Sequence, residues 1–277
     1  MEDLGGYTML YETISISVPG GDAALTVYAP DNTPEIDPNR LRRAVVMCPG
    51  GGYSFTSDRE AEPVALQLLA ADLCVFVLRY AVAPVRYPVA LTQLAAAVRY
   101  VRENAARYHV QADKVAVMGY SAGGHLAASL GVRWNEPWLG ELLQADPRTL
   151  RPDGMVLCYP VISAGAVRHS GSFANLTGSD DPAVWQAHSL ENLVSERTPR
   201  AFLWHTFEDQ TVPVENSLLF FSALRRCGVP SELHIYPQGV HGLSLATELT
   251  AVPGRPDLLR SDSANWLEMA VRWLKQL

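Results

Sequence analysis

The chain opens with the alternation of apolar and polar side chains that is typical of half-buried β-strands. Residues 12–18 read Glu-Thr-Ile-Ser-Ile-Ser-Val, and residues 24–28 form a second short run of this kind. Between them, residues 19–22 read Pro-Gly-Gly-Asp, a strong turn signal. The pattern therefore predicts an antiparallel hairpin at the start of the chain.

Further along, short apolar runs without alternation predict strands that are covered on both faces. These runs are residues 44–48, 73–78, 114–118, 155–159 and 201–205, and residues 232–236 are a further strand. Helical spacing separates most of them. Helices are predicted near residues 59–71, from Leu91 to about Tyr108, over residues 214–227, and around Trp266 and Trp273 near the C-terminus.

Strands that alternate with helices indicate an α/β fold with a mostly parallel sheet and helices on both faces. Residues 160–199 lack periodicity and are expected to be a loop-rich insertion near the site. Because there is neither an internal repeat nor a low-complexity linker, we expect a single domain over residues 1–277.

Composition narrows the classes of function. The net charge of −7 disfavours a nucleic-acid partner, and no apolar run approaches the ~20 residues needed to cross a bilayer. Residues 1–6 lack the basic and apolar segments of a signal peptide. The four cysteines are scattered, and three lie in strand-like runs, which favours buried reduced thiols. We therefore expect a cytoplasmic protein without a membrane partner.

The strongest chemical signal is a G-x-S-x-G pattern at residues 119–123, centred on Ser121. It follows a buried strand and precedes a helical pattern, the context in which a serine is held exposed on a sharp turn. The N-terminus of the following helix would also favour an anion that develops there.

A serine nucleophile needs a base and an acid to orient that base, and on this architecture they follow in the order Ser, Asp or Glu, His. Asp209 lies in the segment after the strand at residues 201–205, and His241 follows the strand at residues 232–236. Glu208 is a rival acid. His205 and His125 are rival bases, but a strand end and a helix start are usual places for structural histidines.

An oxyanion needs backbone N–H donors that can approach the substrate closely. Residues 50–52 are three consecutive glycines after an early strand, and the N–H of Ala122, directly after Ser121, would complete the pair.

Taken together, these segments resemble an α/β-hydrolase of the esterase/lipase type, and the chain is similar to small bacterial acetyl-esterases related to acetyl-xylan esterases. The resemblance spans nearly the whole chain in order: residues 49–53 (PGGGY), 59–63 (REAEP), 78–80 (LRY), 119–126 (GYSAGGHL), 158–161 (CYPV), 205–206 (HT), Asp209 with 212–213 (VP), and 241–242 (HG). It favours Gly51 and Gly52 as the loop donors. Many relatives begin this loop with histidine, whereas this chain has Pro49, so the loop must be braced differently.

The substrate pocket is less determined. Aromatic residues on or near the presumed site loops, together with Val212, are candidates for its lining, although such side chains are more often core: Tyr53, Tyr80, Tyr159 and Trp185. Asp180, Asp181, His169 and His188 show no spacing that defines a metal site. We expect neither a metal nor a cofactor.

The resemblance implies a serine carboxylic-ester hydrolase that removes short acyl groups, most simply acetyl, from carbohydrate such as xylo-oligosaccharides. The short, polar insertion at residues 160–199 also suits a short acyl group better than a lipid chain. A feruloyl-type aryl esterase and a formamidase are alternatives on the same scaffold, and a non-catalytic hydrolase-like binding protein is an alternative from another class. A homo-oligomer is left open.

Overall fold

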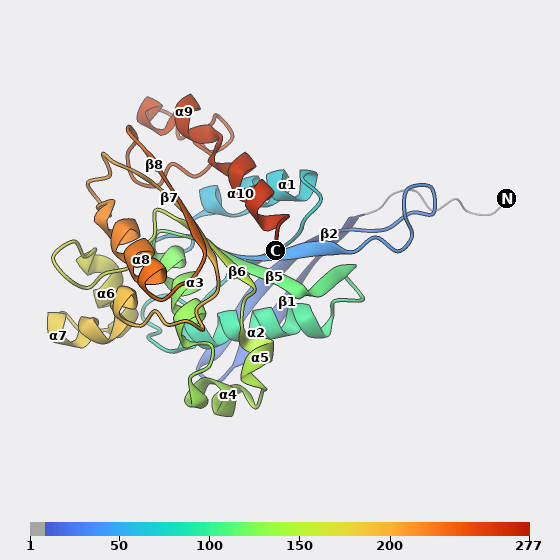
Figure 1. Cartoon of the computed structure of the whole chain (residues 1–277), viewed down its shortest axis with the longest axis horizontal. Coiled ribbons are helices and arrows are strands. Elements are labelled where there is room, and N and C mark those ends of the chain that lie inside the picture. The colour runs from blue at the N-terminus through green and yellow to red at the C-terminus, as the bar shows by residue number, and fades with distance from the viewer. Residues whose placement is uncertain (1–8) are drawn as a thin grey trace.

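The computed structural model describes residues 9–277, whose eight strands form one twisted sheet in the order β1-β2-β4-β3-β5-β6-β7-β8 (Figure 1). The expectation about a signal peptide concerns residues 1–6, which lie outside the described residues. The strands are β1 (Met9–Val18), β2 (Gly21–Pro30), β3 (Arg42–Cys48), β4 (Cys74–Arg79), β5 (Val110–Tyr120), β6 (Gly154–Cys158), β7 (Ala201–Thr206) and β8 (Ser231–Tyr236).

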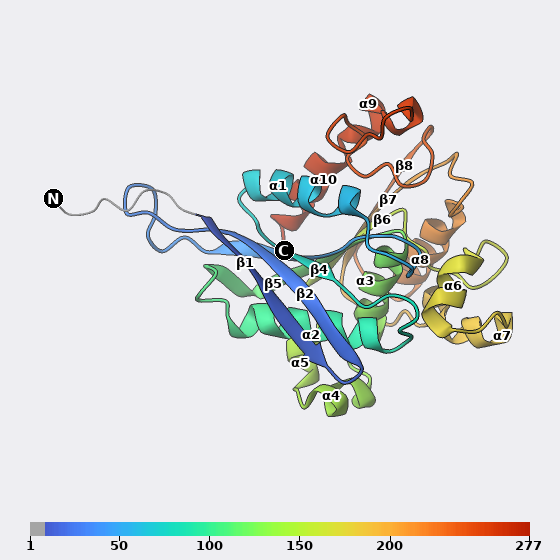
Figure 2. The ribbon, with the colours of Figure 1, turned by 180° about the vertical axis from the view of Figure 1, so that it is seen from behind.

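The predicted hairpin is confirmed and forms one edge of the sheet. β1 pairs with β2 antiparallel from Met9 opposite Pro30 to Val18 opposite Gly21, and β2 pairs antiparallel with β4. Figure 2 shows this long hairpin from behind. From β4 onward every neighbouring pair is parallel. The carboxyl ends of β3, β5, β6, β7 and β8 therefore meet at one edge, where ligands bind in open α/β sheets.

Helices cover both faces of the sheet, as the alternating pattern predicts. One core lies between the sheet and α2, α3 and α8, and the other lies between the sheet and α1 and α10. The helices are α1 (Glu62–Ala70), α2 (Val89–Glu103), α3 (Ala122–Arg133), α4 (Pro137–Leu143), α5 (Pro147–Leu150), α6 (Ser170–Thr177), α7 (Pro182–Trp185), α8 (Glu215–Arg226), α9 (Ser261–Ala264) and α10 (Trp266–Leu274).

Two predicted helix boundaries are wrong. The helix expected from residue 59 begins only at Glu62, after a short 3-10 turn over Asp58–Glu60. Pro63 explains the difference, because proline is tolerated in the first turn of a helix but not in its interior. The helix expected to reach Tyr108 ends at Glu103, where the Asn104 side chain donates a hydrogen bond to the Tyr100 carbonyl.

The segment at residues 160–199 carries more structure than its pattern predicts. It contains α6, α7 and the 3-10 turns Gln186–His188 and Leu190–Asn192. These elements are too short to show a hydrophobic period, and they pack through a small separate cluster that includes Phe173, Trp185 and Val212. Figure 1 shows α6 and α7 beside α8 at the edge of the molecule.

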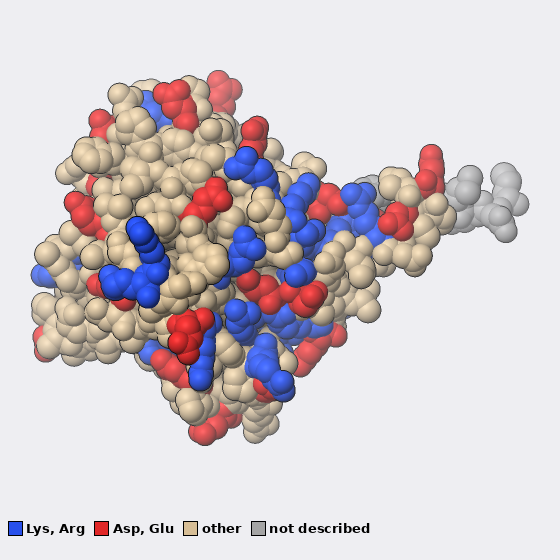
Figure 3. Space-filling model, viewed as in Figure 1, with Lys and Arg blue, Asp and Glu red and all other residues tan. Residues whose placement is uncertain are grey.

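The four cysteines are free thiols, and Cys48, Cys74 and Cys158 are buried as expected. Within residues 9–277, no helix is both long and apolar enough to pass through a bilayer. Basic and acidic side chains are interspersed on the face that Figure 3 shows, rather than gathered into a patch of one sign.

Candidate active site

Ser121 lies on a strained turn between β5 and α3. Its backbone has φ 53° and ψ −117°, a conformation that is costly for a residue with a Cβ. The turn is closed by a hydrogen bond from the Ser121 N–H to the Cys158 carbonyl at 3.0 Å. A Cβ on Gly119 would lie 2.1 Å from the Gly123 carbonyl oxygen, so the glycines of the pattern are required by close approach of the backbone.

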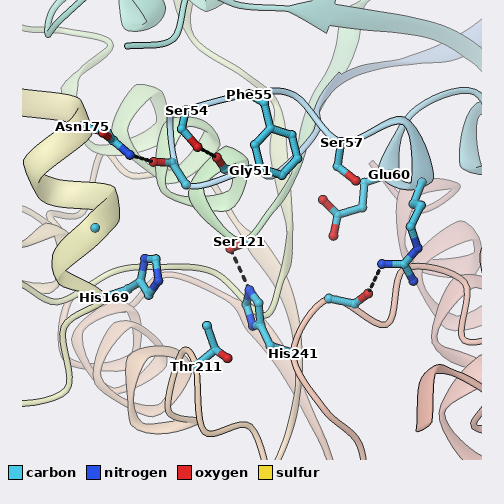
Figure 4. A pocket seen from close by; sticks show the side chains of 14 residues that line it. Gly51, Ser54, Phe55, Ser57, Glu60, Ser121, His169, Asn175, Thr211 and His241 are labelled. Carbon is cyan, nitrogen blue, oxygen red and sulfur yellow. Dashed lines mark hydrogen bonds between the residues drawn. The ribbon is translucent and has the colours of Figure 1, made fainter. Parts of the chain in front are cut away.

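His241 lies on the loop that follows β8, and its imidazole contacts Ser121. Its Nε2 atom lies 2.8 Å from Ser121 Oγ (Figure 4). The loop is held by Arg59, whose guanidinium donates to the Gly242 carbonyl at 2.9 Å and to the Thr250 carbonyl at 2.6 Å. The side chain on the other side of the imidazole is Asp209, whose Oδ2 lies 2.6 Å from His241 Nδ1.

The Asp209 carboxylate is buried and fully hydrogen-bonded. Its Oδ1 atom accepts the N–H groups of Thr211 and Val212, each at 2.9 Å. Burial by itself would raise the pKa of Asp209, but hydrogen bonds from His205 and His241 and from the Val212 amide outweigh it and hold the pKa well below its usual range. Asp209 is therefore an anion that can fix the tautomer of His241.

The rival side chains form hydrogen bonds with groups other than Ser121 Oγ. His205 Nε2 donates to the Val212 carbonyl at 2.8 Å and lies 3.3 Å from Asp209 Oδ2, while its Nδ1 accepts from the Ser217 hydroxyl at 2.8 Å. Glu208 is exposed, and its carboxylate accepts from the Gly239 N–H at 3.4 Å. His125 is buried and hydrogen-bonded to the Tyr53 hydroxyl at 2.9 Å. All three positions fit structural roles.

The loop after β3 turns through three consecutive residues with positive φ: Gly51 at 129°, Gly52 at 63° and Tyr53 at 57°. A Cβ on Gly51 would lie 2.1 Å from the Phe55 carbonyl oxygen, so only glycine fits there. Within residues 9–277 the N–H groups of Gly51 and Gly52 have no hydrogen-bond acceptor. Ala122 is the first residue of α3, where N–H groups precede the intrahelical ladder.

Sequence reasoning gave no role to Glu60, the residue that holds this loop in place. The buried Glu60 accepts the Gly50 N–H at 2.8 Å through Oε2 and the Tyr159 hydroxyl at 2.7 Å through Oε1. Tyr159 in turn accepts the Ser244 N–H at 2.9 Å. This network links the glycine loop to the segment that follows His241. An acidic residue before a helix usually lies in solvent, so the pattern alone did not single it out.

A cavity of about 360 Å³ opens over Ser121 and His241 (Figure 4). Most of its lining residues carry polar side chains: Gly51, Gly52, Ser54, Phe55, Ser57, Arg59, Glu60, Ser121, His169, Gly171, Asn175, Thr211, His241 and Gly242. His169 and Asn175 come from α6 and the residue before it, so two residues of the segment 160–199 line the cavity.

The five predicted pocket residues do not belong to this lining: Tyr53, Tyr80, Tyr159, Trp185 and Val212. All five side chains are buried. The Tyr80 hydroxyl donates to the Pro49 carbonyl at 2.7 Å, and the Trp185 indole donates to the Ser179 carbonyl at 2.7 Å. Among residues 9–277, no cluster of three or more His, Cys, Asp or Glu side chains is arranged to hold a metal ion.

The sheet order, the turn at Ser121 and the residues gathered around it define an α/β hydrolase of the esterase class. Comparison with known proteins agrees, and the chain belongs to the BD-FAE family, whose profile matches residues 25–224.

Among solved structures, an acetyl ester-xyloside bifunctional hydrolase from Caldicellulosiruptor lactoaceticus is 35% identical, with a TM-score of 0.80 and coverage of 96% of both chains. The carboxylesterase Cest-2923 from Lactobacillus plantarum is 30% identical, with a TM-score of 0.87 and coverage of 97% of this chain and 98% of its own.

Among curated proteins, an acetylxylan esterase from Xylanibacter ruminicola is 31% identical over 90% of this chain and 48% of its own length. The endo-1,4-β-xylanase B of Butyrivibrio fibrisolvens is 36% identical over 75% of this chain and 33% of its own length. The chain thus spans between a third and a half of these two curated relatives.

Proposed function

We propose that this protein is a serine carboxylic-ester hydrolase that removes short acyl groups, above all acetyl, from carbohydrate such as xylo-oligosaccharides. The observation that carries the proposal is the continuous chain of contacts from Ser121 Oγ through His241 to Asp209, with distances of 2.8 and 2.6 Å. Both distances lie within the reach that proton transfer between a nucleophile and its base requires.

In the proposed reaction, His241 Nε2 takes the proton of Ser121 as Oγ forms a bond to the ester carbonyl carbon. Asp209 stabilises the imidazolium, and the N–H groups of Gly51, Gly52 and Ala122 donate hydrogen bonds to the developing oxyanion. His241 then protonates the alkoxide as the C–O bond of the ester breaks. A water molecule repeats the two steps on the acyl-enzyme, which releases the acid and restores Ser121.

The names of the relatives support the substrate class. One is an acetylxylan esterase, and a structural neighbour is an acetyl ester-xyloside hydrolase. The cavity supports it as well, because the polar side chains among its lining residues can form hydrogen bonds with the hydroxyl groups of a sugar. The substrate would be a small or oligosaccharide ester, with no cofactor and no nucleic-acid or membrane partner.

The decisive measurement is acetate release from acetylated xylo-oligosaccharides by the wild type and by Ser121→Ala. Removal of the nucleophile should lower kcat by roughly 10⁴-fold or more, since only oxyanion stabilisation and binding remain. Equal rates for the two proteins would exclude Ser121 as the nucleophile.

Two further substrates separate the alternatives in the same assay. Faster cleavage of a feruloyl ester than of an acetyl ester would indicate an aryl esterase, and turnover of a formamide substrate would indicate a formamidase. A binding protein without activity would fail to react with a serine-directed phosphonate. The single domain, the cytoplasmic location and the oligomeric state stay predictions that limited proteolysis, cell fractionation and sedimentation can test.

A further inference from the structure

His169 is the cavity residue whose chemistry the proposed reaction leaves unused. It lies just before α6, and its imidazole lines the cavity together with Ser121 and His241 (Figure 4). The ring is not a further member of the series Ser121, His241 and Asp209, because its Nδ1 atom forms hydrogen bonds with Ser172. That atom accepts the Ser172 N–H at 3.2 Å and lies 2.8 Å from the Ser172 hydroxyl.

These contacts determine the tautomer of His169. An amide N–H can only donate, so Nδ1 must accept, and the ring proton of a neutral imidazole then resides on Nε2. The imidazole is indeed held neutral, since burial and the nearby His241 lower the pKa of His169 despite the opposing charge of Asp209. Within residues 9–277, Nε2 has no hydrogen-bond partner. The cavity thus receives one oriented N–H donor in addition to those of the glycine loop.

A donor at this place needs an acceptor on the substrate. The ester carbonyl oxygen is directed to Gly51, Gly52 and Ala122, and an acetyl group carries no other polar atom. Apart from the bridging oxygen of the ester, the remaining acceptors of a sugar ester lie on its alcohol portion, where hydroxyl oxygens outnumber the ring and glycosidic oxygens. We propose that His169 Nε2–H donates a hydrogen bond to a hydroxyl of the alcohol portion and thereby selects esters of polyols over esters of simple alcohols. This inference rests on the proposed function and adds the residue that recognises the alcohol.

The test uses a pair of esters that differ in one group. 2-Hydroxyethyl acetate carries a hydroxyl where propyl acetate carries a methyl, so the ratio of their kcat/KM values isolates recognition of the hydroxyl. The variant is H169N. Asparagine is a preferred N-cap, so its oxygen can accept the Ser172 N–H and preserve the start of α6, but it is too short to place a donor where Nε2 lies.

We expect the ratio to fall about fivefold in H169N, the size of a lost neutral hydrogen bond. Differences in the intrinsic reactivity of the two esters cancel in the comparison with the wild type. The matched control is S170A, an exposed neighbour in the first turn of α6, which should keep the wild-type ratio. A merely structural role of His169 would lower both rates together and leave the ratio unchanged, and that result would overturn the inference.

Binding gives a second, independent readout. The dissociation constant of acetylated xylobiose should be about fivefold larger for S121A/H169N than for S121A. Equal dissociation constants would also contradict the proposal. Failure of this inference and failure of the proposed function remain distinguishable. Hydrolysis through Ser121 with an unchanged ratio overturns only the role of His169, whereas cleavage of no ester by the wild type overturns both.

Discussion

At the scale of single residues, Glu60 is the side chain that most directly couples the glycine loop to the rest of the site. Both of its oxygens are used, one by the Gly50 N–H and one by the Tyr159 hydroxyl. A buried carboxylate in such a network restrains the backbone it contacts, because leaving either donor unpaired would cost about 1–3 kcal/mol. We regard Glu60 as a positioning residue for the oxyanion loop.

The substitution Glu60→Gln tests this role. The new amide keeps the shape but places an NH₂ group against either the Gly50 N–H or the Tyr159 hydroxyl, which already accepts from Ser244. We expect kcat for p-nitrophenyl acetate to fall about tenfold while KM changes less than about twofold, because a displaced oxyanion donor weakens the transition state more than substrate binding. Tyr159→Phe removes the same link from its other end and should give the same split. A change in KM with kcat preserved would rule out this role.

At the scale of elements, the position of α3 against β3 determines the geometry around Ser121. Gly123 is the contact point: a Cβ there would lie 2.1 Å from the Cys48 carbonyl oxygen and 2.4 Å from that of Pro49. Helix and strand therefore approach as closely as backbones can. This contact aligns the start of α3, and with it the Ala122 N–H, beside the glycine loop.

Gly123→Ala should separate these two elements. Because the obstructing atoms belong to the backbone, the helix must shift, and we expect a loss of at least about 2 kcal/mol in unfolding free energy together with a large fall in kcat. Gly171→Ala in α6 is the matched control for stability, since its Cβ would meet His169 Cε1 at an ordinary 3.5 Å. Urea unfolding of both variants measures the difference. Similar stabilities would mean that the contact at Gly123 relaxes freely.

Helix α6, within residues 160–199, contributes to the candidate active site. Asn175 donates from its side chain to the Gly52 carbonyl at 2.9 Å, and the Leu176 carbonyl accepts the Tyr87 N–H at 2.8 Å. The same short element thus braces the glycine loop and, through its N-cap, orients His169. Asn175 and Glu60 therefore both hold the glycine loop that follows Pro49.

At the scale of the whole molecule, the packing of α3 against the insertion buries two histidines. His125 donates from Nε2 to the His188 carbonyl at 3.0 Å. Burial lowers the pKa of His125 to about 3 and that of His188 to about 4, the latter with a contribution from Arg133. Both side chains are neutral in the folded protein at pH values where they would be protonated in the unfolded chain.

This difference predicts loss of stability in mild acid. The unfolded state binds more protons than the folded state below the unperturbed pKa of about 6.5, so stability is full above that value and declines as the pH falls towards the folded-state pKa values. Each histidine can contribute up to about 1.4 kcal/mol per pH unit. His125→Asn should be less stable than the wild type at pH 7.5 but should lose less on going to pH 5.0. Urea unfolding at the two pH values checks this, and an equal loss in both proteins would contradict it.

Much of the fold was predictable because its signals are local. The alternation at residues 12–18 and the apolar runs of the central strands determine which residues face a core, and all of these strands are confirmed. The pattern around Ser121 predicts a strand, a turn and a helix in that order, and the structure has them. The order of Ser121, Asp209 and His241 along the chain also predicts their approach, since each follows a strand of one parallel sheet.

The other features of the candidate site depend on contacts between segments that are distant in the chain, and no local sequence pattern predicts such contacts. From the sequence alone Glu60 would be expected in solvent, but in the structure it is hydrogen-bonded to Tyr159 and Gly50. His169 would be expected in an exposed loop, but in the structure it lines the cavity. The aromatic residues predicted for the pocket are instead buried and are not among the residues that line the cavity. The periodicity of apolar residues along the chain indicates which side chains are buried, whereas the lining of a cavity depends on how the loops that follow several strands pack together. The elements and the approach of Ser121, His241 and Asp209 are therefore predictable from the sequence, whereas the lining of the cavity is established only by folding.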